Sequence, residues 1–176
     1  MKKEDFKNIS MIGRYAYALL CIEYLFAKKF PKKNFTRIFK FLWTGTKSAN
    51  WNKISEFVSD LKSDSLFRST VFDKENFFII NEIDFEFYYK LFEDIKDISN
   101  VCFSSLFDFL TIYENTLIPS FGKESIDCLF EIINLLKKYQ VELPSIKIIS
   151  FSTFKERNGW GDNFDGTSLS IILKRE

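Results

Sequence analysis

Histidine is absent from this chain of 176 residues. Without it there can be no Ser-His-Asp triad, no Cys-His nucleophile pair and no zinc or iron site with histidine ligands. Acid–base catalysis would depend on carboxylates, Lys, Tyr or Cys with shifted pKa values, because no side chain titrates near neutrality in its ordinary state. The composition excludes the commonest catalytic designs, so we expect a protein that is not an enzyme and assign no catalytic residue.

Cysteine is scarce, and its three positions lie far apart in the sequence: Cys21, Cys102 and Cys128. An odd number of cysteines without a C-x-x-C pair indicates neither a disulfide framework nor a zinc ribbon. Buried, unreactive thiols are the expected state of such residues. We therefore predict no metal site and no cofactor.

A long apolar run is also missing. The most apolar stretch, residues 15–22, is flanked by Gly13-Arg14 and Glu23, and it is much shorter than the roughly 20 residues of a membrane-spanning helix. The N-terminus has lysines but no apolar run directly behind them, unlike a signal peptide. These absences predict a cytoplasmic protein that does not insert into a membrane.

Proline is rare, and all three prolines fall between periodic segments. Apolar residues recur at spacings of three and four in most of the remaining chain, which is typical of amphipathic helices. Ser10 is the expected N-cap of the first helix, and Gly45 the expected end of the second. The predicted helices cover approximately residues 10–29, 34–45, 48–61, 99–117 and 123–139.

One segment is ambiguous. Residues 71–83 could form a strand or a buried loop. From Asp84 onward, Phe85 and Phe87 alternate like a strand, whereas Phe85 and Tyr88 repeat like a helix. Asp84 as N-cap favours a helix.

The sequence predicts a mainly α protein, with residues 1–176 forming a single helical domain. A hydrophobic fraction of 46% in a chain of this length suffices for one core. We expect a bundle or array of about six to seven helices. The segment after Pro144 is irregular and could include short strands.

The net charge of +1 conceals a strong asymmetry. Residues 1–50 carry a net charge of +8, residues 51–115 carry −7, and residues 116–176 are neutral. Such separation of charge along a chain often reflects contact with a charged partner. It is the most informative property of the composition.

The acidic middle contains carboxylates with aromatic residues among them. This combination suits recognition of a basic protein, because charge steers the encounter and aromatic side chains provide buried anchors. A plain solvated face is an equally good interpretation. The candidate binding residues are Asp73, Glu75, Glu82, Asp84, Glu86, Tyr88, Tyr89, Glu93, Asp94 and Asp97.

The basic segment 28–40 offers an alternative function. Its lysines alternate with Phe30, Phe35 and Phe39, and such residues could contact phosphates and stack on bases. A helix–turn–helix junction with solvated lysines and inward phenylalanines is favoured, because the aromatic residues match the apolar phase of the helices. A third possibility, an enzyme based on carboxylates and a divalent metal, would require a convergent acidic cluster.

Two groups of residues resemble a known family. The first comprises Gly13 to Ala18, Cys21-Ile22-Glu23, Phe41 to Thr44, and Trp51; the second comprises Pro144, Phe154 and Gly159 to Asp162. Together they resemble the small helical immunity proteins encoded beside bacterial polymorphic toxins, including those of contact-dependent growth inhibition systems. The resemblance covers about a third of the chain and leaves the acidic middle outside it.

The resemblance implies a non-catalytic protein that neutralises one cognate toxin domain by stoichiometric binding in the cytoplasm of the producing cell. It implies that Arg14, Ala16, Ala18, Trp43 and Trp51 belong to the scaffold, so the unmatched acidic surface is where we expect recognition. If the toxin is a nuclease with a basic groove, the carboxylates could occupy the places of phosphates. The sequence leaves open the identity of the toxin and the oligomeric state.

Overall fold

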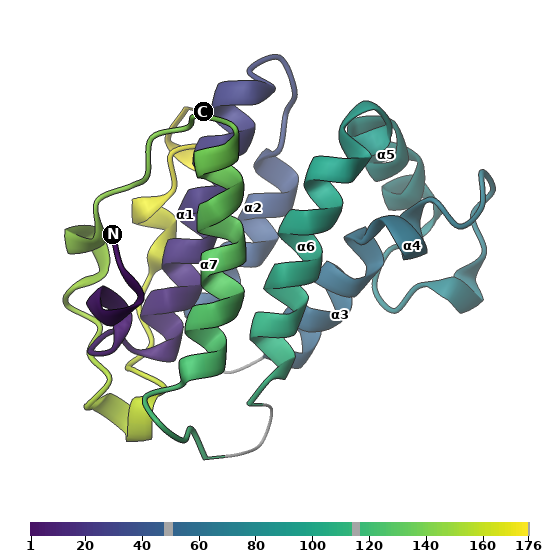
Figure 1. Cartoon of the computed structure of the whole chain (residues 1–176). Coiled ribbons are helices and arrows are strands. Elements are labelled where there is room, and N and C mark those ends of the chain that lie inside the picture. The colour runs from purple at the N-terminus through teal and green to yellow at the C-terminus, as the bar shows by residue number, and fades with distance from the viewer. Residues whose placement is uncertain (48–50, 114–116, 176) are drawn as a thin grey trace.

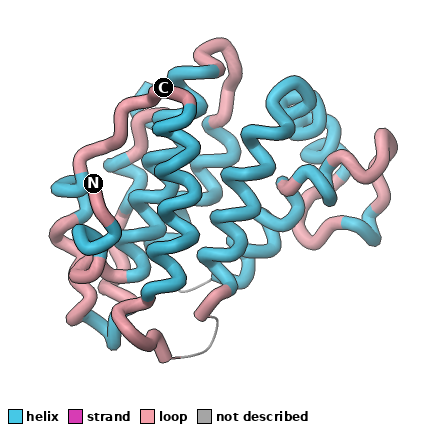
Figure 2. Tube along the Cα trace, viewed as in Figure 1, coloured by secondary structure: helices cyan, strands magenta, loops and turns pink. Residues whose placement is uncertain are grey.

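The computed structural model describes residues 1–47, 51–113 and 117–175, and it confirms a mainly α protein. No strand occurs in these three segments, where the single bridge between Ile9 and Thr153 is the only β-type pairing (Figure 2). Short 3-10 turns connect the helices and make up most of the C-terminal segment. The α-helices are α1 (Met11–Lys29), α2 (Thr36–Leu42), α3 (Trp51–Leu61), α4 (Ser63–Leu66), α5 (Glu82–Phe92), α6 (Lys96–Thr111) and α7 (Lys123–Lys138).

Helix α1 lies at the centre of the fold and is buried on nearly all sides. Its N-terminus is capped by Ser10, whose hydroxyl accepts a hydrogen bond of 3.1 Å from the Gly13 amide, as the sequence predicts. Ala16 and Ala18 are fully buried, and their small side chains let neighbouring elements approach closely. A helix that is apolar all round belongs in the interior, and α1 does.

Helix α7 packs along α1, and α6 packs between α7 and α3 (Figure 1). The C-terminal segment covers another side of α1. Tyr17 of α1 contacts the C-terminal segment by donating a hydrogen bond of 2.6 Å to the Pro144 carbonyl. Tyr15 of α1 contacts the end of α2 by donating a hydrogen bond of 2.7 Å to the Leu42 carbonyl. Both termini lie away from α5 and the loop before it, which project from the opposite end of the molecule (Figure 1).

Arg14 joins three parts of the scaffold from a fully buried position. Its guanidinium donates to the Phe6 carbonyl at 3.0 and 3.2 Å, and to the Gly122 carbonyl and the Ser125 hydroxyl at 2.9 Å. The Phe154 ring lies 5.2 Å from the guanidinium carbon. The neutral partners do not offset the loss of hydration, so burial lowers the pKa of Arg14 to about 10.

Glu23, in the C-terminal half of α1, also joins separate parts of the scaffold through hydrogen bonds. It is buried and accepts from the Trp43 indole at 2.8 Å, from the Ser170 hydroxyl at 2.5 Å and from the Ile171 amide at 2.7 Å. Burial raises the pKa of Glu23, and these hydrogen bonds oppose that shift. The contacts fasten the C-terminal segment to α1.

Two glycines permit the C-terminal segment to pack directly against Trp43 and Ser10. A Cβ on Gly166 would fall 2.5 Å from the Trp43 ring, and a Cβ on Gly161 would fall 2.2 Å from the Ser10 hydroxyl. Gly161 also has a positive φ of 85°, which side chains other than glycine rarely adopt. The glycine-rich turn is therefore part of the packed scaffold.

Several predicted boundaries are wrong. Helix α6 begins at Lys96 rather than Ser99, and Leu117 is a loop residue rather than part of that helix. The second helix changes to a 3-10 turn over Trp43–Thr46. The predicted start of the third helix, Ser48, lies outside the described residues. The C-terminal segment forms 3-10 turns in the places where short strands were considered.

Candidate protein-binding surface

The acidic segment forms an arm at the end of the molecule opposite the termini (Figure 1). We define the acidic arm as residues 67–97, which include the loop 67–81, helix α5 and the first turn of α6. It contains eight carboxylates and four basic residues. The sequence places these charges in one span, and the structure places them on one projecting unit.

The ambiguous segment resolves into a loop followed by a helix. Residues 71–81 contain one 3-10 turn, Lys74–Asn76, and no strand. Helix α5 begins at Glu82, and its N-cap is Asn81, whose side chain accepts a 3.0 Å hydrogen bond from the Asp84 amide. The prediction of a helix is confirmed, and the prediction of Asp84 as N-cap is wrong by one turn.

A small aromatic cluster supports the loop from within. The rings of Phe72 and Phe77 stack at 5.6 Å, and Phe77 lies 5.6 Å from Phe85 of α5. Tyr89, one turn further along α5, packs against Phe67 at 5.0 Å. The loop therefore has packed contacts of its own with the inner face of α5.

The buried carboxylate of Asp60, at the end of α3, fixes the last part of the loop. It accepts hydrogen bonds from three consecutive backbone amides, those of Phe78, Ile79 and Ile80, at 3.0, 2.8 and 3.0 Å. Ile80 points into the core, whereas Phe78 is 72% exposed. A carboxylate with its hydrogen-bonding capacity used in this way is well suited to burial.

The outer face of α5 combines carboxylates with apolar side chains. Glu82, Ile83, Glu86 and Phe87 are all exposed there, and the exposed fraction of Ile83 is 76%. In the loop, Val71 and Phe78 are also largely exposed. Single apolar side chains are normal at a protein surface, whereas a contiguous group of them is typical of a site that binds another molecule.

Basic residues from the N-terminal region neutralise part of the arm. Arg37 of α2 forms an ion pair with Asp84, and Lys33 forms one with Asp94 at 2.6 Å. The Lys33 ammonium also donates to the Leu91 carbonyl at 2.8 Å, and its hydrogen bond to Asp94 lowers the pKa of that carboxyl. The positive head and the negative middle of the sequence thus meet in the fold.

The structure separates the candidate residues into three groups. Tyr88 is 3% exposed and Tyr89 is half-buried, and the two tyrosines contact Phe57 and Phe67 on the inner side of α5. Asp84 and Asp94 are engaged in ion pairs within the chain. The carboxylates that remain exposed without an ion pair to any described residue are Asp73, Glu75, Glu82, Glu86, Glu93 and Asp97.

Sequence reasoning missed the apolar residues of the surface and the role of Asp60. Ile83 and Phe87 fall outside the helical stripe formed by Phe85, Tyr88 and Phe92, but the strand-like alternation of the same segment groups Phe87 with Phe85, so the sequence does not decide their exposure. No sequence signal identifies Asp60, because its three partners follow 18 to 20 residues later in an irregular loop. Long-range capping of that kind is visible only in three dimensions.

The basic segment 28–40 keeps its aromatic residues inside. Phe35 and Phe39 are buried and Phe30 is half-buried, and rings in these positions cannot serve as a platform for bases. Lys28, Lys29, Lys32 and Lys40 are exposed on its surface, whereas Lys33 is engaged with the arm.

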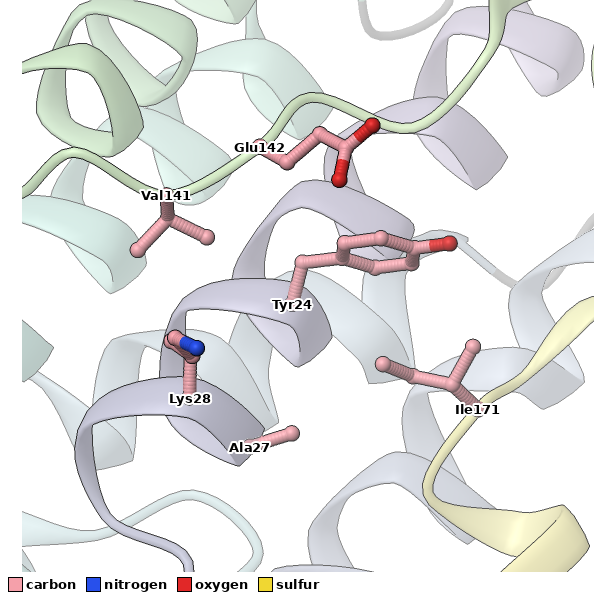
Figure 3. Close-up of a pocket in the computed structure, with 6 residues that line it drawn as sticks. All are labelled: Tyr24, Ala27, Lys28, Val141, Glu142 and Ile171. Atoms are coloured by element: carbon pink, nitrogen blue, oxygen red, sulfur yellow. The ribbon is translucent and has the colours of Figure 1, made fainter.

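Two shallow hollows flank the C-terminal half of α1. One, of about 390 Å³, lies between Tyr24 and Lys28 of α1, Glu142 after α7, and Ile171 of the C-terminal segment (Figure 3). The other, of about 300 Å³, follows the turn between α1 and α2 and includes Lys32. No hydrogen bond among the described residues joins the polar side chains of Figure 3 to one another.

The side chains that could bind a metal are dispersed among the described residues. Among the described residues, no three Cys, Asp or Glu side chains converge as metal ligands would. Cys21 and Cys102 are fully buried, and burial raises the pKa of both thiols. Partial burial, and then the charges of the nearby Asp108 and Glu131, raise the pKa of Cys128 to about 11.

Comparison with known proteins identifies no relative: no family model, no curated protein and no solved structure matches the chain. Within the described segments, no helix has the length and apolar character needed to cross a bilayer. Function is therefore inferred from the geometry of the described residues, among which the acidic arm combines exposed carboxylates with exposed apolar side chains.

Proposed function

We propose that this chain is an immunity protein that binds a cognate bacterial toxin domain stoichiometrically and neutralises it, with the acidic arm as its binding surface. The observation that carries the proposal is the exposure of four apolar side chains within an acidic unit: Val71, Phe78, Ile83 and Phe87. These side chains contribute little to the core, and their solvation costs free energy in the unbound protein. Their retention at the surface is accounted for if a partner covers them.

The charge of the arm specifies the chemistry of that partner. Glu75, Glu82, Glu86 and Glu93 are exposed on the same arm as the apolar side chains, so a complementary surface is basic and contains an apolar depression. Electrostatic attraction between the two surfaces accelerates the encounter, and burial of the apolar groups slows dissociation. A toxin domain with a positively charged active-site groove matches this description.

The nucleic-acid alternative has weaker support. Exposed lysines in segment 28–40 could contact phosphates, but Phe35 and Phe39 are buried and Lys33 and Arg37 pair with carboxylates of the arm. A shift of labelled DNA or RNA that depends on salt and is lost when Lys28, Lys29, Lys32 and Lys33 are changed to Ala would favour it.

Growth rescue provides the first test of the proposal. The neighbouring gene is expected to encode a large secreted protein with a variable C-terminal domain. Expression of that domain should arrest growth, and co-expression of this chain should restore it. Rescue by another small protein from the same locus, but not by this chain, would contradict the assignment.

Charge reversal then tests the surface. In the triple variant Glu82→Lys, Glu86→Lys and Glu93→Lys, the association rate with the purified toxin domain should fall about tenfold or more at low salt. Asp84 is left unchanged because it pairs with Arg37. The matched control reverses three exposed acids outside the arm, Glu4, Glu142 and Asp162. Equal rates for both triple variants would exclude the arm as the binding surface.

A further inference from the structure

The Asp60 carboxylate occupies an unusual position at the base of the acidic arm. It is 1% exposed, and its two oxygens face three consecutive amides of the loop. Successive N–H groups that converge in this manner form a small concave site for a negative charge. No lysine or arginine of the described segments forms an ion pair with Asp60, so the three backbone amides balance its charge.

These hydrogen bonds determine where Phe78 points. Phe77, the preceding residue, packs inward against the ring of Phe85, and Ile80, two residues further on, lies in the core. With the backbone of residues 78–80 fixed on Asp60, the Phe78 side chain is directed into solvent. An exposed phenylalanine on an unrestrained loop would fold back onto nearby apolar groups, because burial of its ring is favourable.

We propose that Asp60 is a positioning residue for recognition: it holds Phe78 in the orientation in which the ring enters an apolar depression on a basic partner protein. This inference depends on the proposed function, since it assigns Phe78 as the central contact of the same surface. Asp60 itself does not touch the partner. It acts by ordering the loop before binding. Less conformational entropy is then lost on binding, so the affinity is higher.

The chemistry of the partner follows from the surroundings of Phe78. The ring projects from a unit whose exposed charged groups are mainly carboxylates. Aromatic anchors dominate binding energy when charged or polar groups around them exclude water. A depression ringed by lysines or arginines on a toxin domain fits this arrangement, and an acidic or uniformly polar surface does not.

Hydrogen exchange tests the positioning without any partner. Asp60→Asn replaces one acceptor by an NH₂ group, which cannot accept from the loop amides. Exchange of the amides of Phe78, Ile79 and Ile80 should accelerate about tenfold or more, whereas exchange in α1 should be unchanged. The matched control is Asp165→Asn, since Asp165 also accepts a backbone amide, that of Thr167, on the C-terminal segment. Unchanged exchange at residues 78–80 would overturn the proposal whatever the partner is.

Binding to the purified toxin domain from the neighbouring gene tests the link to Phe78. Asp60→Asn should raise the Kd about tenfold, and Phe78→Ala should raise it at least as much. In the Phe78→Ala background, Asp60→Asn should add less than about threefold, because the side chain that it orients is gone. Asp165→Asn should leave the Kd unchanged.

Two results would separate the possible failures. An equal loss of affinity from Asp60→Asn in both backgrounds would show a general structural role and overturn the positioning role alone. Wild-type affinity in Phe78→Ala and Ile83→Ala would overturn the binding surface itself, together with this proposal. If circular dichroism shows that Asp60→Asn does not fold, Asp60→Ser, which keeps one acceptor, replaces it in both measurements.

Discussion

Two buried ionisable residues of α1 hold the N-terminal and C-terminal segments of the chain against this helix. Arg14 and Glu23 lie within the same helix, and both are buried. Each uses its side chain to hold a segment that contains no α-helix: residues 1–10 in the first case and 166–173 in the second. The irregular ends of the chain are therefore fastened by polar contacts to the most buried helix.

Replacement of Arg14 tests the first of these contacts. In Arg14→Lys a single ammonium cannot reach the Phe6 and Gly122 carbonyls together, so buried acceptors lose their partners. We expect the free energy of unfolding to fall by about 2–4 kcal/mol, measured by urea denaturation. Arg68→Lys is the control, because Arg68 is exposed and should change stability by less than about 0.5 kcal/mol. Similar stability for both variants would contradict this role of Arg14.

The raised pKa of Glu23 makes stability depend on pH in a defined direction. Between its usual value of 4.5 and the higher value in the fold, the folded state binds more protons than the unfolded state. Stability from this group is therefore present at low pH and is lost as pH rises through the folded pKa. Relative to Glu23→Gln, which does not titrate, the wild-type free energy of unfolding should decrease with rising pH. Urea midpoints from pH 5 to 8 measure this difference, and a constant difference would contradict it.

At the scale of elements, two ion pairs connect segment 33–37 to the acidic arm. The Arg37 guanidinium pairs with Asp84 and lies 5.7 Å from the centre of the Phe87 ring, so one residue contacts both the charge and the aromatic part of the arm. Lys33 makes the second connection. The arm is thus attached to the scaffold by contacts that salt can weaken.

A double-mutant cycle measures the strength of the first connection. The coupling between Arg37→Ala and Asp84→Ala should be about 0.5–1.5 kcal/mol, since Asp84 is mostly buried while the Arg37 side chain is half-exposed. At 1 M NaCl the coupling should fall, because screening then acts within about 3 Å. The pair of Lys47 and Asp165, which are both about half-exposed, is the control and should couple by less than about 0.5 kcal/mol. Equal coupling in the two pairs would contradict the proposed attachment.

The helices were predictable from the sequence because their signals are local. Ser10 caps α1, and the apolar stripes of α3 and α7 lie on their buried faces, as their periodicity indicates. The start of α6 was misplaced because Ser99, an apparent N-cap, instead donates its hydroxyl to the Lys96 carbonyl within the helix. The acidic character of the candidate surface was also predictable, but its apolar component was not.

The unpredictable features share one physical cause. The contacts of Glu23 with Ser170 and of Asp60 with Phe78 join residues far apart in the sequence, and neither leaves a periodic pattern. The burial of Tyr88 and the exposure of Phe87 are decided by which side of α5 faces the aromatic cluster. An adjacent pair of aromatic residues does not reveal this orientation until the neighbouring elements are placed.

At the scale of the whole molecule, the chain divides into a closed scaffold and a projecting arm. The C-terminal segment shares one core with helices α1, α6 and α7. Arg14 and Glu23 of α1 hold the N-terminal and C-terminal segments against this core by hydrogen bonds. The arm depends on Asp60, on its own aromatic cluster and on the ion pairs with segment 33–37, and the inner face of α5 joins the common core through Phe92. The exposed outer face of the arm can therefore change in sequence with little effect on that core.

Native-state hydrogen exchange should reveal this division as two levels of stability. Amides of α1 should exchange only through global unfolding, because the helix is buried on nearly all sides. Amides of α5 should exchange through a partial opening whose free energy is lower by about 1–3 kcal/mol, since fewer buried contacts hold the arm. Added urea should affect exchange from α1 more steeply than exchange from α5, because global unfolding exposes more surface. Equal free energies and equal urea dependence in the two helices would show a single cooperative unit and contradict a separable arm.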